Sequence, residues 1–241
     1  MTTNHPVTYR TLTRKDYPAL EAFMDSLYKT KDEPQRVSQR LLNRLYLYDM
    51  LSRHTYARVA CLGSRIAGLI VGRCTTDQPR HPQRQTTGAP RHPGACLRLS
   101  GSWLRRPGPR LRHPMLWLRR SFYLAALLLC RQGPSCARAY RTFIQTDRQL
   151  LQSCPEPFEG ELLFIAVAPQ LRHQGIGLTL LGGFHKYMLS HGARQIYLFT
   201  DSGCCFSFYD RLRFDRLRTC YWQKNAPKTD FAFYLYKFSY F

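Results

Sequence analysis

Residues 1–71 alternate between short β-branched runs and longer stretches whose apolar side chains recur at helical spacing. Thr13 with Asp16 three residues later is typical of a helix start. The short link Gly63–Ser64 between two β-branched runs favours a hairpin. The pattern therefore predicts a strand, two helices and a hairpin, at residues 7–11, 13–27, 34–51, and 55–62 with 66–71.

The C-terminal third has a sharper pattern, which starts at Glu161. Residues 162–167 form a nearly continuous apolar run, which indicates a strand buried on both faces. The order strand, helix, strand over residues 161–200 implies a right-handed crossover between parallel strands. The predicted strands are 162–167, 196–199, 214–223 and 231–238, and the predicted helices are 175–190 and 206–212.

The middle of the chain has a different composition. Residues 75–112 are dense in Arg, Pro, Gly and His, which cannot sustain the interior of a helix or sheet, so we expect an irregular loop. Two helix-compatible stretches follow, at 115–130 and 137–151. We therefore expect one domain over residues 1–241, interrupted at 75–150 by an insertion that ends in a helical pair.

The charge is concentrated in this insertion. The 241-residue chain carries a formal charge of +21, yet residues 78–146 contain no Asp or Glu and 13 arginines. Such an excess is compatible with a nucleic acid, an anionic surface or an acidic protein as partner, and residues 115–130 could lie on a membrane surface. No known nucleic-acid-binding module is present, and Pro and Gly scatter the charges. We therefore favour a variable insertion that packs a helical pair beside the substrate cleft.

Other features of the composition exclude several classes of protein. The nine cysteines show no disulfide framework and no zinc-ligand spacing, so we expect free thiols, no metal site and a cytoplasmic location. Residues 1–10 are polar and lack the apolar core of a signal peptide. The longest apolar run, residues 122–130, is far shorter than the ~20 residues that a spanning helix needs, which argues against an integral membrane protein.

One motif carries candidate chemistry. Residues 172–177, Arg-His-Gln-Gly-Ile-Gly, lie between the predicted strand 162–167 and the helix that follows. The two glycines allow a ligand to approach the backbone, and the helix N-terminus behind them offers unpaired N–H groups. Together they could hold a phosphate group, although a tight strand-to-helix turn would have the same pattern. Leu180 stands where a dinucleotide fingerprint would need its third Gly, and no Gly-Lys-Ser/Thr follows.

With its preceding strand, this motif resembles the acetyl-CoA-binding motif of the GCN5-related N-acetyltransferase (GNAT) family. Residues 197–201 resemble the next strand of that family, and residues 208–214 resemble its Phe-Tyr-x-x-x-Gly-Phe element. The predicted elements of residues 7–71 match its N-terminal half. The resemblance covers residues 7–73 and 159–238, and some bacterial members carry a helical insertion between these parts.

The resemblance implies an α/β fold: a mixed, mostly antiparallel sheet flanked by helices, whose central parallel pair splays to admit acetyl-CoA. It implies transfer of an acetyl group from acetyl-CoA to an amine, which attacks directly in a ternary complex. Backbone groups of Val167 and Ala168 would bond the pantetheine arm and the thioester carbonyl. The CoA pyrophosphate would be held by the backbone of Arg172, His173, Gln174, Gly175, Ile176 and Gly177.

Two side chains are candidates for proton transfer. Glu161 stands eleven residues before Arg172, the spacing of the base glutamate in the histone-acetylating branch of the family. It could equally be a strand-end carboxylate that caps the sheet, and Glu159 is the alternative base. Tyr209 matches the tyrosine that often protonates the leaving thiolate, but it could also only pack against the CoA arm.

The sequence departs from the family pattern at two positions. Arg213 replaces the usual Gly before Phe214, and a left-handed turn there would disfavour Arg, so we expect a different local turn. Cys205 stands where an Asn often bonds the cofactor, which puts that CoA contact in doubt. No base accompanies Cys204 or Cys205, so we expect ordinary buried thiols. The alternative function is a non-catalytic CoA-binding or polyanion-interaction module; the identity of the amine stays open.

Overall fold

The computed structural model describes residues 6–28, 33–76, 113–222 and 231–240. Most of the expected loop at 75–112 lies outside the described residues. The helices are α1 (Tyr17–Leu27), α2 (Glu33–Arg53), α3 (Pro114–Leu129), α4 (Gly133–Gln152), α5 (Ile176–Ser190) and α6 (Ser207–Arg211). The strands are β1 (Val7–Thr11), β2 (Tyr56–Leu62), β3 (Arg65–Cys74), β4 (Gly160–Val167), β5 (Gln195–Asp201), β6 (Asp215–Tyr221) and β7 (Ala232–Ser239).

All seven strands form one sheet in the order β1-β2-β3-β4-β5-β7-β6. Every neighbouring pair is antiparallel except β4 and β5, which are parallel. The chain passes from β4 to β5 through α5, as the apolar run and the following helical pattern predicted. The predicted mixed, mostly antiparallel α/β sheet with a central parallel pair is therefore confirmed.

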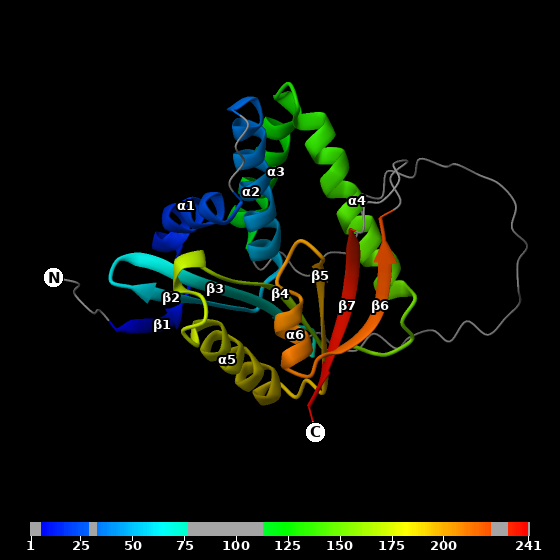
Figure 1. The fold of residues 1–241 in the computed structure, drawn as a ribbon. Helices are drawn as coiled ribbons and strands as arrows, with labels where there is room; N and C mark the ends of the chain where they lie inside the picture. Colours follow the sequence, from blue (N-terminus) through cyan, green and yellow to red (C-terminus); the bar gives the residue numbers. More distant parts are fainter. Residues whose placement is uncertain (1–5, 29–32, 77–112, 223–230, 241) are drawn as a thin grey trace, which may run out of the picture.

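Helices cover both faces of this sheet (Figure 1). One face packs against α5, whose Leu180, Phe184 and Met188 are fully or almost fully buried. The opposite face has two separate groups of apolar side chains. The first joins α1, α2 and α3 to β2, β3 and β4, and the second joins α4 to β5, β6 and β7.

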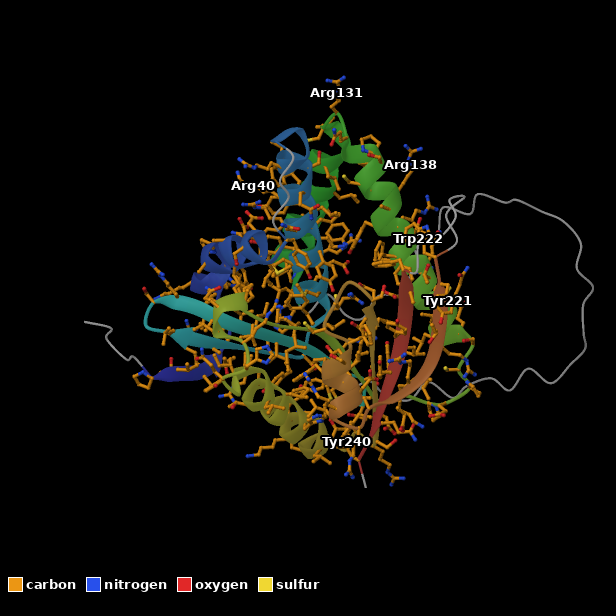
Figure 2. All side chains as sticks on the ribbon, viewed as in Figure 1. Arg40, Arg131, Arg138, Tyr221, Trp222 and Tyr240 are labelled. Atoms are coloured by element: carbon orange, nitrogen blue, oxygen red, sulfur yellow. The ribbon has the colours of Figure 1, made fainter. Side chains whose placement is uncertain are left out.

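The helical pair α3–α4 packs against α2 (Figure 1). Arg119 donates to the Tyr48 hydroxyl oxygen of α2 at 2.9 Å, and Arg120 donates to the Asp49 carboxylate at 2.6 Å. Tyr123 stacks on Tyr48 with ring centroids 5.4 Å apart. Two of the arginines that raise the charge of the insertion therefore hold α3 to α2. Figure 2 shows Arg131 and Arg138 at the far end of the pair, pointing outward.

The two helices begin and end close to the predicted residues. Gly133 and Pro134, expected to interrupt the helical pattern, form the first turn of α4. A proline is favoured there because its missing N–H would have no partner in the first turn of a helix. The separation of α3 from α4 is consequently limited to residues 130–132.

Candidate acetyl-transfer site

The parallel strands β4 and β5 separate part-way along their length. They pair only at Gly160–Ile196, Glu161–Tyr197 and Leu162–Leu198. On its other side β4 stays paired with β3 as far as Val167, and β5 stays paired with β7 as far as Asp201. The facing edges of residues 163–167 and 199–201 thus have no strand partner in the described chain; we call this gap the β4–β5 opening.

A bulge in β4 lies where the opening begins. Val71 pairs with Phe164 and Gly72 with Leu162, so Leu163 is an extra residue in β4. A bulge bends its strand and increases the local twist. This bulge lies directly after Leu162, the last residue of β4 that pairs with β5.

Residues 172–177, here called the cradle loop, connect the end of β4 to α5. Two of its residues are left-handed, His173 with φ 62° and Gly175 with φ 77°. Thr179 is the first residue in this part of the chain whose N–H joins the α5 ladder, donating to the Gly175 carbonyl at 3.0 Å. The N–H groups of the first turn, from Ile176 to Leu178, are therefore free to bind an anion.

The two glycines of the cradle loop leave room beside their Cα atoms for a ligand at the backbone. A Cβ placed on Gly175 would meet no heavy atom within 4 Å. A Cβ on Gly177 would make only ordinary contacts, at 3.7 Å to Val167 and 3.8 Å to Phe208. The glycines thus do not relieve a clash within the protein; they leave the backbone uncovered. The residues present fit a pyrophosphate group, although a tight turn alone would also permit this geometry.

The end of β4 offers one of the two residues expected to bond the pantetheine arm. The Ala168 N–H donates to Ala67 of β3 at 2.8 Å, and its carbonyl accepts from Leu171 at 2.9 Å. Because backbone groups alternate along a strand, Val167 faces the β4–β5 opening. Its carbonyl accepts from Arg172 Nε at 3.3 Å. Val167 is therefore better placed than Ala168 to bond a ligand through its backbone.

Tyr209 lies on α6, on the same face of the sheet as α5. Its ring packs between Phe214 and Tyr236, with centroid distances of 5.5 and 5.8 Å. Burial raises the pKa of the Tyr209 phenol, and the neighbouring Cys204 and Cys205 raise it further. The hydroxyl is consequently protonated at pH 7 and can donate a proton or a hydrogen bond.

Cys204 and Cys205 follow β5 and are both exposed, so the expectation of buried thiols is wrong. Cys204 Sγ donates to Asp201 Oδ2 at 3.6 Å. Partial burial of the thiol, followed by the Asp201 charge, raises the pKa of Cys204 to about 11. Cys204 is therefore a thiol at pH 7. The Cys205 carbonyl accepts from Phe208 N at 3.0 Å at the start of α6.

Glu161 and Glu159 have different environments. Glu161 is 7% exposed. Its carboxylate lies 3.1 Å from Arg73 Nη2 and 4.0 Å from Arg53 Nη1, so its charge is paired with two guanidinium groups. Glu159 accepts from the N–H groups of Arg194 and Gln195 at 2.7 and 2.9 Å and caps the start of β5. The assignment of Glu161 as the base stays a prediction.

The turn before β6 keeps the family's geometry despite its arginine. Arg213 has φ 62°, a left-handed conformation. The expectation of a different turn is therefore wrong. The Phe214 N–H donates to the Tyr209 carbonyl at 3.1 Å, and this bond across the turn holds the conformation against the steric preference of Arg213.

One carboxylate near the opening was not predicted from the sequence. Asp147 of α4 electrostatically couples to Glu161 and Asp201, and burial together with these charges raises its pKa to about 7. A sequence signal exists: Asp147 is the first acidic residue after Asp77, and in a predicted helix it stands four residues after Phe143 and three before Leu150. That spacing places it on the same side of the helix as Phe143, Leu150 and Leu151.

The comparisons with known proteins address this site directly. The sequence model described as the acetyltransferase (GNAT) family matches residues 104–205. That stretch contains α4, β4, the cradle loop, α5 and β5. Residues 104–205 of this chain therefore match the GNAT family. No curated protein matches the sequence.

Several solved structures align with this chain along most of its length. The ribosomal-protein-S18-alanine N-acetyltransferase from Escherichia coli is 11% identical, covering 97% of this chain and 94% of that chain, with a TM-score of 0.49. Arabidopsis thaliana NAA60 with a bisubstrate analogue is 10% identical, covering 97% and 98%, with a TM-score of 0.49. A GNAT acetyltransferase from Streptococcus pneumoniae is 14% identical, covering 98% and 100%, with a TM-score of 0.47.

Two features are absent from the parts of this chain that the structure describes. They contain no group of three or more His, Cys, Asp or Glu side chains placed to hold a metal ion. They also contain no helix of the length and apolarity needed to cross a bilayer.

Proposed function

We propose that this chain is an N-acetyltransferase that moves an acetyl group from acetyl-CoA to an amine by direct attack in a ternary complex. The observation that carries the proposal is the cradle loop at the N-terminus of α5, set beside the β4–β5 opening. An anion-binding backbone next to a parted parallel pair gives room for a phosphate-bearing arm and for its reactive end. Acetyl-CoA supplies an activated acetyl thioester.

Binding is assigned to backbone groups. The backbone of residues 172–177 holds the pyrophosphate, because the free N–H groups of the first turn of α5 point to the helix end. Val167 bonds the pantetheine arm along the edge of β4 and so directs the thioester into the opening. Cys205, which is exposed just before α6, makes a further contact to the pantetheine arm.

The chemical step needs one proton removed and one supplied. The amine nitrogen forms a bond to the acetyl carbon, the carbon–sulfur bond breaks, and the thiolate takes a proton. Tyr209 supplies that proton, because its burial among aromatic rings keeps its hydroxyl protonated. The amine must lose a proton to a carboxylate or to water, and Glu161 is the group that the family resemblance suggests.

Titration calorimetry with acetyl-CoA tests the binding. We expect the parent chain to bind and Gly175→Glu to bind at least about tenfold more weakly, because it places a negative charge where the pyrophosphate is held. Gly192→Glu is the matched control. Gly192 also has a positive φ, 72°, and a Cβ placed on it would likewise meet no heavy atom within 4 Å, but it lies after the other end of α5. A folded parent that binds no acetyl-CoA would refute the proposed function.

A further inference from the structure

Asp147 occupies an unusual place on α4. Its neighbours on the same side of the helix, Phe143 and Leu150, pack against the sheet with Tyr197, Phe233 and Leu235. Asp147 therefore points toward the same face of the sheet as these apolar side chains, although a carboxylate is normally placed in solvent. It is only partly exposed, which means that its charge has lost some of its hydration.

No described side chain or backbone group compensates for that loss with a hydrogen bond or a close ion pair. Within the described part of the chain, Asp147 accepts no hydrogen bond and forms no ion pair within 4 Å. The other carboxylates around the β4–β5 opening are engaged. Glu161 is paired with Arg73, and Asp201 accepts from the Gly203 N–H at 2.8 Å. An uncompensated carboxylate on a packed helix face has a cost in stability that a structural role does not explain.

Asp147 also lies on the side of α4 that covers the β4–β5 opening. Phe143 and Leu150 on that side pack in one cluster with Phe199, the first residue of β5 beyond its pairing with β4. It couples electrostatically to Glu161, which begins the paired part of β4, and to Asp201, which ends β5 on the open side. Tyr197 and Asp201 share one face of β5 because they are four residues apart, and that face is the one covered by α4. The cradle loop and α5 lie on one face of the sheet and α4 on the other, so Asp147 stands on the side of the opening that the proposed CoA arm leaves to the amine.

The charged and titratable groups around Asp147 come from several elements. The Asp147 pKa is raised by burial and by the charges of Glu161 and Asp201, and Arg53 opposes them. The Tyr46 and Tyr140 phenols are coupled to it, and β7 contributes only the apolar Phe233 and Leu235 among these neighbours. The balance leaves a carboxyl group that changes its protonation near neutral pH, as a general base requires.

We propose that Asp147, and not Glu161, takes the proton from the attacking amine. This inference rests on the proposed acetyl transfer. The N–H bond of the amine breaks, its electron pair forms the bond to the acetyl carbon, and the proton passes to a carboxylate oxygen of Asp147. Glu161 then positions Arg53 and Arg73 and does not exchange the proton. The helical pair α3–α4 thereby supplies a catalytic residue as well as a wall of the amine site.

The protonation of Asp147 is measured by NMR on the full chain labelled with ¹³C at the aspartate carboxyl carbons. The Asp147 signal is the one missing from Asp147→Asn. We expect a titration midpoint near 7. A midpoint below about 5, close to that of an ordinary carboxylate, would overturn the assignment whatever turnover shows.

Turnover is measured as release of the CoA thiol from acetyl-CoA, with spermidine, an Nα-acetylated lysine amide and a peptide with a free N-terminus as acceptors. We expect Asp147→Asn to bind acetyl-CoA like the parent, to lower kcat by about 10²-fold or more, and to lose the rise of kcat/KM with pH around 7. Asp215→Asn, on the exposed part of β6, is the matched control with parental kinetics. An Asp147→Asn variant with the parental pH profile would overturn the inference.

The two proposals fail in different ways. If the parent binds no acetyl-CoA in calorimetry, the acetyl transfer itself is wrong. If the parent binds acetyl-CoA and Glu161→Gln loses the pH-dependent limb while Asp147→Asn keeps it, only the assignment of Asp147 is wrong. If it binds acetyl-CoA but acetylates none of the three amines, the NMR midpoint decides the assignment.

Discussion

The two sides of the β4–β5 opening are built by different means. On the α5 side, the cradle loop presents backbone N–H groups, and its two glycines leave that backbone uncovered. On the α4 side, the surface consists of side chains from α2, α4, β4 and β5, among them Arg53, Asp147 and Glu161. Backbone recognition needs a short contiguous motif, whereas side-chain recognition needs elements that are far apart in the sequence.

Within the α4 side, two carboxylates also contrast. Glu161 has two guanidinium partners, and Asp147 has none among the described residues. The first is a structural ion pair and the second is a group whose protonation can change. A carboxylate near a cleft is therefore not identified as a general base by its position alone. Its ion-pair and hydrogen-bond partners are more informative.

The largest expected change in stability comes from Glu161→Gln. Removing this carboxylate leaves Arg53 and Arg73, which are 28% and 24% exposed, without its charge. We expect a loss of about 2–3 kcal/mol in the free energy of unfolding, read from urea denaturation. Glu156→Gln, which breaks the more exposed pair with Lys237, is the control and should cost less than about 1 kcal/mol. Equal losses in both variants would remove the contrast between a structural pair and a free carboxylate.

Asp147→Asn should change stability in the opposite direction, and only at higher pH. The folded pKa of Asp147 is about 7, raised from 3.8, so between these values the folded chain holds a proton that the unfolded chain has released. Stability therefore falls as pH rises through this window. We expect Asp147→Asn to be more stable than the parent by about 1–2 kcal/mol at pH 8 and equal to it near pH 3, where both forms are neutral. Thermal unfolding at the two pH values measures this, and a pH-independent difference would contradict it.

The smallest expected effect concerns the α5 side. Arg213 has φ 62°, so Arg213→Gly should remove the steric cost of a left-handed arginine. We expect a gain of about 1 kcal/mol in the free energy of unfolding, with acetyl-CoA binding unchanged. Arg211→Gly, inside α6, is the control and should lower stability, because Gly disfavours helix. A loss of stability in Arg213→Gly would mean that contacts of the arginine side chain outweigh the backbone strain.

Much of the fold was predictable from local patterns. The strand 162–167, the helix that follows and the strand 196–199 were predicted with their parallel relationship, because buried parallel strands have continuous apolar runs. The cradle loop was predictable for the same local reason: Gly175 is the residue before α5, and Gly177 lies in the first turn of that helix. The helical pair was predicted as well, but its attachment to α2 through Arg119 and Arg120 was not.

The sequence by itself determined the order of the elements, the parallel crossover and the position of the cradle loop, since each depends on residues close together in the chain. Only the tertiary structure decided which carboxylate is paired. Glu161 meets Arg53 and Arg73 across more than 80 residues, and Asp147 reaches the opening only because α4 packs on β5 and β7. The state of a charged side chain depends on its hydration and its neighbours in space, and neither is encoded by local spacing.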